Sequence, residues 1–353
     1  MKVLGVILII IVVIVLISVF WPIVTGRSPG GDVSGGSLYQ STDGGENWHN
    51  LEKFPGGEVS DLAFDSSQPD FIFAGTENRG LWRGKRDGTS WGQFQESLGE
   101  GSKIFDILEP ASLPSLKALV FFENRGRMIA SSERGREELL STPLERFTYF
   151  KGAFFRGRVR VIGSDGGLYE SLDGGRAWSV RARFKDGLLL FAENRSSPSE
   201  IWVIDGRGFF YRSQDGGRNW TDLTPGLADF AAYEDARIIF YESRTGILYH
   251  GSRHGLLASY DKGESFKEIP LPAPGNTLPV SAVATDWANP SKLFVGAGNQ
   301  LYISTYAGAS WKIIKIPAQG SVSSILIDPA EAKNIFVGLK KTERVKQSLN
   351  VGG

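Results

Sequence analysis

Short runs of apolar and aromatic residues recur along the chain between residues 38 and 339, and clusters of Gly, Asp, Ser and Pro separate them. Residues 59–64 (VSDLAF), 71–74 (FIFA) and 280–284 (VSAVA) are typical runs. Such runs predict β-strands, and the short spacers predict antiparallel pairing through tight turns. The pattern therefore indicates an all-β fold.

One octet of residues sets the period of these strands. Copies of the pattern S-x-D-x-G-x-x-W, some of them with a substitution, begin at residues 41, 171, 213, 259 and 304, and degraded copies begin at residues 84 and 131. Successive copies start 40 to 47 residues apart. The residues that carry the pattern are Ser41, Asp43, Gly45, Trp48, Ser171, Asp173, Gly175, Trp178, Ser213, Asp215, Gly217, Trp220, Ser259, Asp261, Gly263, Phe266, Ser304, Gly308 and Trp311.

The octet period predicts blades of four short antiparallel strands. Two strands lie upstream of each octet, a third leads into it, and a fourth follows its aromatic residue. Residues 38–51 supply an octet with only its last two strands, and residues 322–338 supply two strands with no octet. Together these halves complete one blade, which predicts a seven-bladed β-propeller closed by its N- and C-terminal strands, with no open sheet edge.

The octet resembles the Asp-box, also called the BNR repeat, and the resemblance extends from residue 38 to residue 339. It implies that each octet forms a hairpin turn between the third and fourth strands of a blade, at the outer rim of the ring. The residue types agree, because Ser and Asp oxygens accept hydrogen bonds from turn N–H groups and Gly adopts a left-handed backbone. Turns so far apart on the rim imply a structural role for the octet acids, not metal binding or catalysis.

Proteins that share Asp-box repeats include sialidases, xyloglucanases, the sortilin ectodomain and the photosystem II stability/assembly factor family. A single seven-bladed ring without long insertions looks most like the last group. That resemblance implies a binding or scaffolding protein that engages a protein or a component of the cell envelope. Because fold resemblance does not settle function, a glycan-directed hydrolase or carbohydrate-binding propeller is the alternative.

The first 26 residues differ from the rest of the chain. No charged residue lies between Lys2 and Arg27, and residues 3–21 are almost wholly apolar. A helix over this stretch is about 30 Å long, enough to cross a bilayer core. A cleaved signal peptide is the alternative, but no small-residue cleavage site follows the apolar run. We therefore expect a transmembrane anchor at 1–26, a flexible linker at 27–37, the propeller at 38–339 outside the cytoplasm, and a polar basic tail at 340–353.

Composition limits the chemistry of the chain. Its 39 basic and 39 acidic residues balance, which argues against general affinity for nucleic acid. Without cysteine it has no disulfide or thiolate metal site. The only histidines are His49, His250 and His254, and no third ligand accompanies the close pair. We expect no metal and no cofactor.

One segment departs from the neutral average. Residues 149–160 (YFKGAFFRGRVR) contain Lys151, Arg156, Arg158 and Arg160. If this segment is one strand, the alternation of its arginines places all three on one face. A solvated strand face is the simpler interpretation, and an anionic docking patch is the more specific one.

The enzyme hypothesis has few residues to support it. The F/Y-R-I-P segment of sialidases is absent, and xyloglucanase-like enzymes pair two propellers around a cleft whereas only one is expected here. Asp61 and Asp106, both inside first strands, are the acids placed to line a central channel. A second acid series, read as turn residues between first and second strands, comprises Asp65, Glu109, Glu193, Glu242, Asp286 and Asp328.

Overall fold

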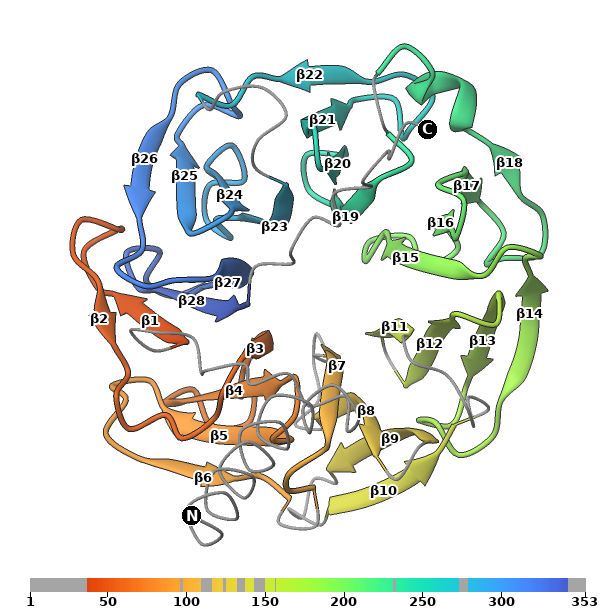
Figure 1. Ribbon diagram of the computed structural model, residues 1–353. Helices are drawn as coiled ribbons and strands as arrows, with labels where there is room; N and C mark the ends of the chain where they lie inside the picture. Colours follow the sequence, from red (N-terminus) through yellow and green to blue (C-terminus); the bar gives the residue numbers. More distant parts are fainter. Residues whose placement is uncertain are drawn as a thin grey trace, which may run out of the picture.

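Seven four-stranded antiparallel sheets surround a central opening in the protein (Figure 1). The computed structural model describes residues 37–95, 98–108, 116–122, 125–131, 137–142, 150–155, 157–230, 233–272 and 279–341. Within each of blades 1 to 6 the strands follow one another in chain order from the channel to the rim. The prediction of a seven-bladed all-β propeller is confirmed.

The first three blades come from the first half of the chain. Blade 1 comprises β3 (Val59–Phe64), β4 (Phe71–Thr76), β5 (Leu81–Lys85) and β6 (Trp91–Gln93). Blade 2 comprises β7 (Lys103–Leu108), β8 (Lys117–Phe122), β9 (Arg125–Ser131) and β10 (Glu137–Ser141). Blade 3 comprises β11 (Phe150–Phe155), β12 (Arg158–Gly163), β13 (Gly167–Ser171) and β14 (Ser179–Arg183).

The next three blades repeat this arrangement. Blade 4 comprises β15 (Leu188–Glu193), β16 (Ile201–Asp205), β17 (Phe210–Ser213) and β18 (Thr221–Asp222), and the short 3-10 helix η1 (Thr224–Leu227) follows it. Blade 5 comprises β19 (Ala236–Glu242), β20 (Ile247–Ser252), β21 (Gly255–Ser259) and β22 (Lys267–Ile269). Blade 6 comprises β23 (Val280–Thr285), β24 (Leu293–Ala297), β25 (Gln300–Ser304) and β26 (Lys312–Lys315).

Blade 7 closes the ring with strands from both ends of the fold. It comprises β27 (Ser321–Ile327), β28 (Ile335–Lys340), β1 (Leu38–Ser41) and β2 (His49–Asn50). β1 pairs with β28 in antiparallel register, with Leu38 opposite Gly338. The predicted closure is confirmed, and the last strand runs on to Lys340, beyond the predicted end of the propeller at residue 339.

The hydrophobic core lies between neighbouring blades. Seven clusters of buried side chains are found among the described residues, and each combines residues from two adjacent blades. Phe294 of blade 6, for example, packs in one cluster with Val337 of blade 7. Since both faces of a blade are covered, second strands such as β16 and β24 are buried at every position.

Each well-preserved octet forms the expected hairpin turn between the last two strands of its blade. In blade 4 the Ser213 hydroxyl accepts a hydrogen bond from the Gly217 N–H at 2.8 Å and donates one to Asp215 at 2.9 Å. The Asp215 carboxylate accepts bonds from two further turn N–H groups, those of Arg218 and Asn219. These bonds hold the pKa of Asp215 below its usual range.

The octet glycine is required by both conformation and packing. Gly217 has φ +89°, and a Cβ there would lie 2.7 Å from Leu168 of blade 3. Gly308 has φ +96°, and its Cβ would lie 2.4 Å from Ile269 of blade 5. A side chain at either position would therefore strain the turn and separate two blades.

Several predictions concern residues outside the described ranges. These are the anchor at 1–26, the linker at 27–37 except for its last residue, Arg156, Glu109, the tail after Lys341 and the turn of the degraded octet that begins at residue 131. In the ranges that the structure describes, no helix combines the length and apolar character needed to cross a membrane.

Candidate functional site: charged residues of blades 1 to 4

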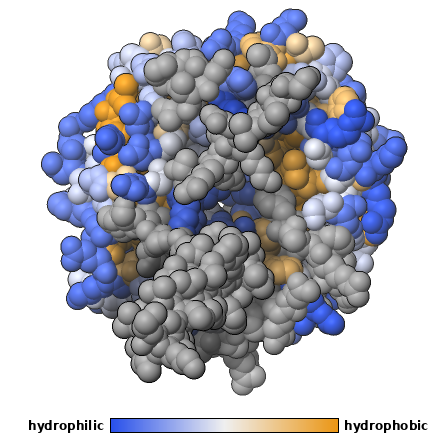
Figure 2. Space-filling view, in the orientation of Figure 1, coloured by the Kyte–Doolittle hydropathy of each residue, from blue (hydrophilic) through white to orange (hydrophobic). Residues whose placement is uncertain are grey.

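The middle of the ring is hollowed, and hydrophilic residues are visible at the opening (Figure 2). Six of the seven inner strands carry a register shift near their start, for example between Val59 and Asp61 in β3 and between Ile104 and Asp106 in β7. A bulge leaves one residue unpaired and increases the local twist of a strand. The two channel acids that the sequence singled out, Asp61 and Asp106, each follow such a bulge.

Asp61 and Asp106 connect neighbouring blades. The Asp61 carboxylate accepts a hydrogen bond from the backbone N–H of Ile107 in β7 at 2.8 Å. The Asp106 carboxylate accepts the equivalent bond from Gly152 in β11 at 2.9 Å. Each acid therefore satisfies a backbone donor on the next inner strand, where strands of different sheets cannot pair with one another.

Two serines make a related connection elsewhere in the ring. Ser281 in β23 donates to the carbonyl of Val322 at 2.5 Å, and Ser323 in β27 donates to the carbonyl of Val59 at 2.6 Å. Side chains at the inner-strand bulges thus supply cross-blade hydrogen bonds at several junctions of the ring.

Asp61 is the most perturbed acid in this channel wall. Burial, together with the nearby charge of Asp106, raises the pKa of Asp61 to about 7, although Lys151 acts in the opposite direction. The Lys151 ammonium lies 3.7 Å from the Asp106 carboxylate. A carboxyl group with a pKa near neutrality can exchange a proton with a ligand. Here its oxygens already accept bonds from the N–H groups of Leu62 and Ile107.

The predicted basic segment folds as a hairpin, not as one strand. β11 ends at Phe155, Gly157 turns with φ +84°, and β12 begins at Arg158. The expectation that Arg156, Arg158 and Arg160 share one strand is therefore wrong, because a left-handed turn intervenes. Lys151 lies on the preceding strand, opposite Ile162.

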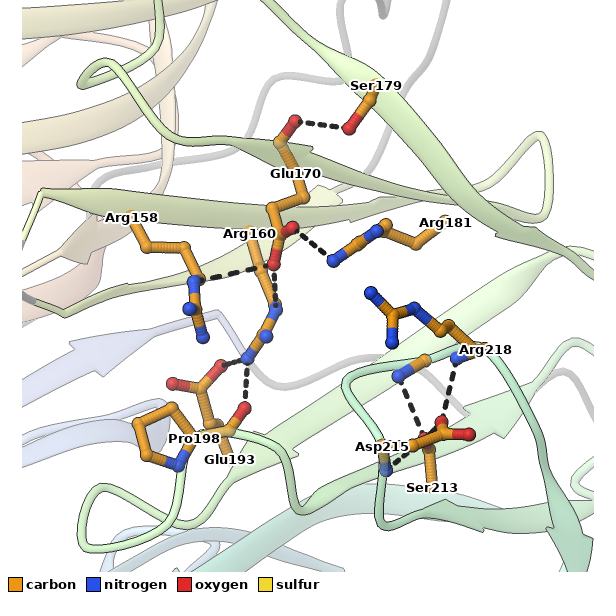
Figure 3. Close-up of polar contacts among 11 residues, drawn as sticks. Arg158, Arg160, Glu170, Ser179, Arg181, Glu193, Pro198, Ser213, Asp215 and Arg218 are labelled. Atoms are coloured by element: carbon orange, nitrogen blue, oxygen red, sulfur yellow. Dashed lines mark hydrogen bonds and ion pairs between the residues drawn. The ribbon is translucent and has the colours of Figure 1, made fainter.

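Arg160 does not lie on an exposed face. Its side chain is 2% exposed, and Nε lies 3.0 Å from the Glu170 carboxylate. The guanidinium also contacts Glu193 of blade 4 at 2.5 Å and donates to the carbonyl of Pro198 (Figure 3). Arg160 thus neutralises buried acids at the junction of blades 3 and 4, which leaves Lys151 and Arg158 as described candidates for a surface patch.

Glu170 is a charged residue that the sequence reasoning missed. Its side chain is 2% exposed and lies among three guanidinium groups, those of Arg158 at 3.5 Å, Arg160 at 3.0 Å and Arg181 at 2.7 Å (Figure 3). Arg160 and Glu170 are cross-strand partners in the β12–β13 hairpin. Counting strand pairs outward from the turn between Ile162 and Leu168 would have paired them.

The second acid series forms turns as predicted where it is described. Asp65, Asp286 and Asp328 accept hydrogen bonds from backbone N–H groups two and three residues ahead, and Glu242 accepts one from Arg244. Glu193 differs, because its carboxylate meets Arg160 of the neighbouring blade. Burial raises the pKa of Glu193 above its usual value, and Arg160 opposes that shift.

The histidines do not form a metal centre in the described ranges. His250 in β20 is fully buried, and both of its ring nitrogens lack a hydrogen-bond partner there. No group of three or more His, Asp or Glu side chains in the described part of the chain is arranged to hold a metal ion.

The fold has clear counterparts among solved structures. No protein-family model matches the chain, and no curated protein matches its sequence. The GH74 xyloglucanase from Xanthomonas campestris superposes with a TM-score of 0.66 at 18% identity, over 83% of this chain and 52% of that one. YCF48 from Cyanidioschyzon merolae superposes with a TM-score of 0.61 at 14% identity, over 86% of this chain and 98% of that one.

A third structure, YCF48 bound to a D1 peptide, has a TM-score of 0.59 at 15% identity and is covered over 94% of its length. The chain spans about half the length of the two GH74 structures that it resembles. At these identities the likeness shows the seven-bladed propeller fold alone.

Proposed function

We propose that this chain is a membrane-tethered binding propeller that holds a protein or cell-envelope partner close to the bilayer. In this proposal residues 1–26 anchor the chain and the propeller lies outside the cytoplasm. The octets are proposed to be Asp-boxes that stabilise the blades and take no part in recognition.

The observation that carries the proposal is the state of the channel acids. A glycosidase needs two carboxyl groups facing a substrate, about 5–10 Å apart. Asp61 and Asp106 instead direct carboxylate oxygens to backbone N–H groups of the next inner strand. The acids singled out for chemistry are therefore engaged in holding blades together, which favours binding over hydrolysis.

The extent of the structural likeness also supports a binding role. The propeller accounts for nearly the full length of YCF48 but only half of the GH74 enzymes. The YCF48 structure with a D1 peptide shows that a ring of this fold can hold a peptide.

Partner capture by the full-length chain tests the proposal. The chain, purified in mild detergent, is incubated with solubilised membranes from its source cells and assayed in parallel against a panel of glycoside substrates. Specific capture without turnover supports the binding role. Robust glycoside turnover that is lost in Asp61→Asn or Asp106→Asn would establish the hydrolase alternative instead.

A further inference from the structure

The guanidinium groups around Glu170 exceed the carboxylates that they contact. Arg158, Arg160 and Arg181 all meet the single carboxylate of Glu170, and of these three only Arg160 forms an ion pair with a second acid among the described residues, Glu193. The buried part of this cluster is Arg160 with its two acids, each 5% exposed or less. One positive charge in the cluster is therefore left unbalanced. It belongs to the partly exposed outer layer of the cluster, which consists of Arg158 and Arg181.

That layer retains hydrogen-bonding capacity. The side chains of Arg158 and Arg181 are 37% and 27% exposed. A guanidinium has five N–H donors in a planar fork, and Glu170 uses only some of them. The Nε atoms of both arginines are buried, and that of Arg158 faces Glu170 at 3.5 Å, so the donors open to a ligand belong to the terminal nitrogens of the two guanidinium groups.

A third arginine comes from the neighbouring blade. The octet turn of blade 4 packs against the cluster, since a Cβ on Gly216 would lie 3.4 Å from the Arg160 guanidinium and one on Gly217 would lie 3.7 Å from Arg181. Arg218 follows directly in that turn, and its side chain extends toward the cluster (Figure 3). Its guanidinium has no ion pair among the described residues, while the nearby Asp215 carboxylate accepts bonds from the N–H groups of its own turn.

We propose that Arg158, Arg181 and Arg218 form a docking site for carboxylate side chains of an acidic peptide segment. This inference rests on the proposed binding function and assigns it a surface, where the octet turn of blade 4 packs against blade 3. Arginine forks bind carboxylates through paired N–H groups, and several forks on one surface suit a run of Asp or Glu residues. Four guanidinium groups against three carboxylates (Glu170, Glu193 and Asp215) keep this surface positive.

The buried Arg160–Glu170–Glu193 group positions this site. Glu170 holds the guanidinium groups of Arg158 and Arg181 close together at the surface. The rotamers of both arginines are therefore restricted before a ligand binds. A site arranged in advance loses less side-chain entropy when a ligand arrives. Arg160 and Glu170 are therefore positioning residues, and the three outer arginines are the residues that contact the ligand.

A fluorescein-labelled oligoglutamate peptide titrated against the full-length chain tests the site by fluorescence anisotropy. Arg181→Gln and Arg218→Gln are each expected to weaken binding about five- to tenfold, and the wild-type affinity should fall steeply between about 50 and 500 mM NaCl. The matched control is Arg207→Gln, an exposed arginine in the turn between β16 and β17, at the end of blade 4 opposite its octet turn. It removes the same charge and should leave binding unchanged.

Three results would overturn the inference. Equal peptide affinity in all variants removes the site, and so does equal weakening by the Arg207 control. Arginine-dependent binding of inorganic phosphate or of phosphatidylglycerol vesicles without peptide binding would assign the arginine surface to phosphate groups. Since Arg218 has no ion pair within the described part of the chain, the Arg218→Gln chain should fold, and it keeps the test decisive.

Partner capture separates this inference from the proposed function. If the Arg181→Gln/Arg218→Gln chain captures the same membrane partner as the wild type, the arginine surface is not the docking site, but the binding function stands. If the wild-type chain captures no partner, the proposed function itself fails. Loss of capture in the double variant, with capture retained in the Arg207 control, supports both.

Discussion

The indole N–H of Trp202 donates a hydrogen bond to the backbone carbonyl of Lys262 at 2.8 Å, which joins the second strand of blade 4 to the octet turn of blade 5. Trp202 is fully buried, and its ring lies 4.4 Å from that of Tyr241. Lys262 has φ +67°, so the carbonyl belongs to a backbone conformation that few non-glycine residues adopt. An aromatic side chain of one blade thus holds the turn of the next.

Replacement of Trp202 by Phe should destabilise the propeller. The change removes the bond to Lys262 and leaves a space between blades 4 and 5, at an expected cost of about 2–3 kcal/mol. Urea unfolding followed by circular dichroism measures the loss. Trp287, which is 63% exposed, provides the control, since Trp287→Phe should change stability little. Equal effects would show that the cross-blade bond contributes nothing.

Arg160→Met should be among the most damaging single substitutions. It leaves Glu170 and Glu193 buried without their shared cation, and breaking a buried ion pair costs about 3–5 kcal/mol. The loss should shrink as pH falls from 8 to 5, because burial already raises the pKa of Glu193 and a protonated acid no longer needs the cation. Thermal unfolding at both pH values tests this, and a pH-independent loss would contradict it.

His250 should make the fold sensitive to acid. Burial lowers the pKa of His250 to about 4, while an unfolded histidine titrates near 6.5. The unfolded chain binds the proton more readily between these values, so stability is complete above about pH 6.5 and falls toward pH 4. His250 should account for about 2 kcal/mol of the stability lost between pH 7 and pH 5.

His250→Leu tests this assignment, because leucine fills a similar volume and carries no titrating group. Its stability should depend less on pH between 7 and 5 than that of the wild type. The exposed His49 serves as the control, as His49→Gln should leave the wild-type pH dependence in place. An unaltered slope in His250→Leu would assign the acid sensitivity to other groups.

Asp61 should affect stability in the opposite direction to His250, because its contribution to folding weakens as the pH rises. The variant Asp61→Asn tests this. The pKa of Asp61 is raised to about 7, above the unfolded value near 4, so the folded chain holds this proton more tightly. The contribution of Asp61 to stability is therefore lost as pH rises through 7. Relative to the wild type, Asp61→Asn should gain about 1–2 kcal/mol between pH 5 and pH 8, a range that allows for screening by channel water.

Guanidinium unfolding at the two pH values measures that gain. An exposed acid, Asp70, provides the comparison as Asp70→Asn. A stability difference between wild type and Asp61→Asn that stays constant with pH would show that Asp61 keeps its charge in the fold.

Tyr306→Asp should restore a complete octet in blade 6. Ser304 already accepts the hydrogen bond from Gly308 at 2.8 Å, but no carboxylate accepts the N–H of Ser310 as Asp215 accepts that of Asn219 in blade 4. Since Tyr306 is 72% exposed, its removal sacrifices little packing. The melting temperature should rise by about 1 to 2 °C. Tyr306→Ala is the control and should not raise it.

The octet repeat made the architecture predictable from the sequence, but it did not predict the ion pairs of Arg160 with Glu170 and Glu193. Octet spacing located the blades and the closure of β1 on β28, because each octet fixes one hairpin and its flanking strands. Arg160 looked like a surface residue because one of its partners, Glu193, lies in another blade. A contact between side chains of two different blades leaves no local pattern in the sequence.

The inner-strand bulges were equally hidden from the sequence. One extra residue near the start of a strand does not disturb a period of 40 to 47 residues, yet it precedes both channel acids. The acids themselves lie in the first strands of their blades, as predicted. Their backbone partners on the next strand, Ile107 and Gly152, depend on how two blades are aligned, which only the assembled ring determines.

The pairing of β1 with β28 also constrains how the protein is made. β1 and β2 can pair with each other as soon as both are made, but the other edge of β1 has no partner until the ribosome has released the segment up to Lys340. That edge therefore stays open while the other six blades are translated. Closure of the ring is therefore a late event in the synthesis of the propeller. A ribosome that stalls within the last blade leaves an unclosed ring, whose exposed strand edges favour edge-to-edge association.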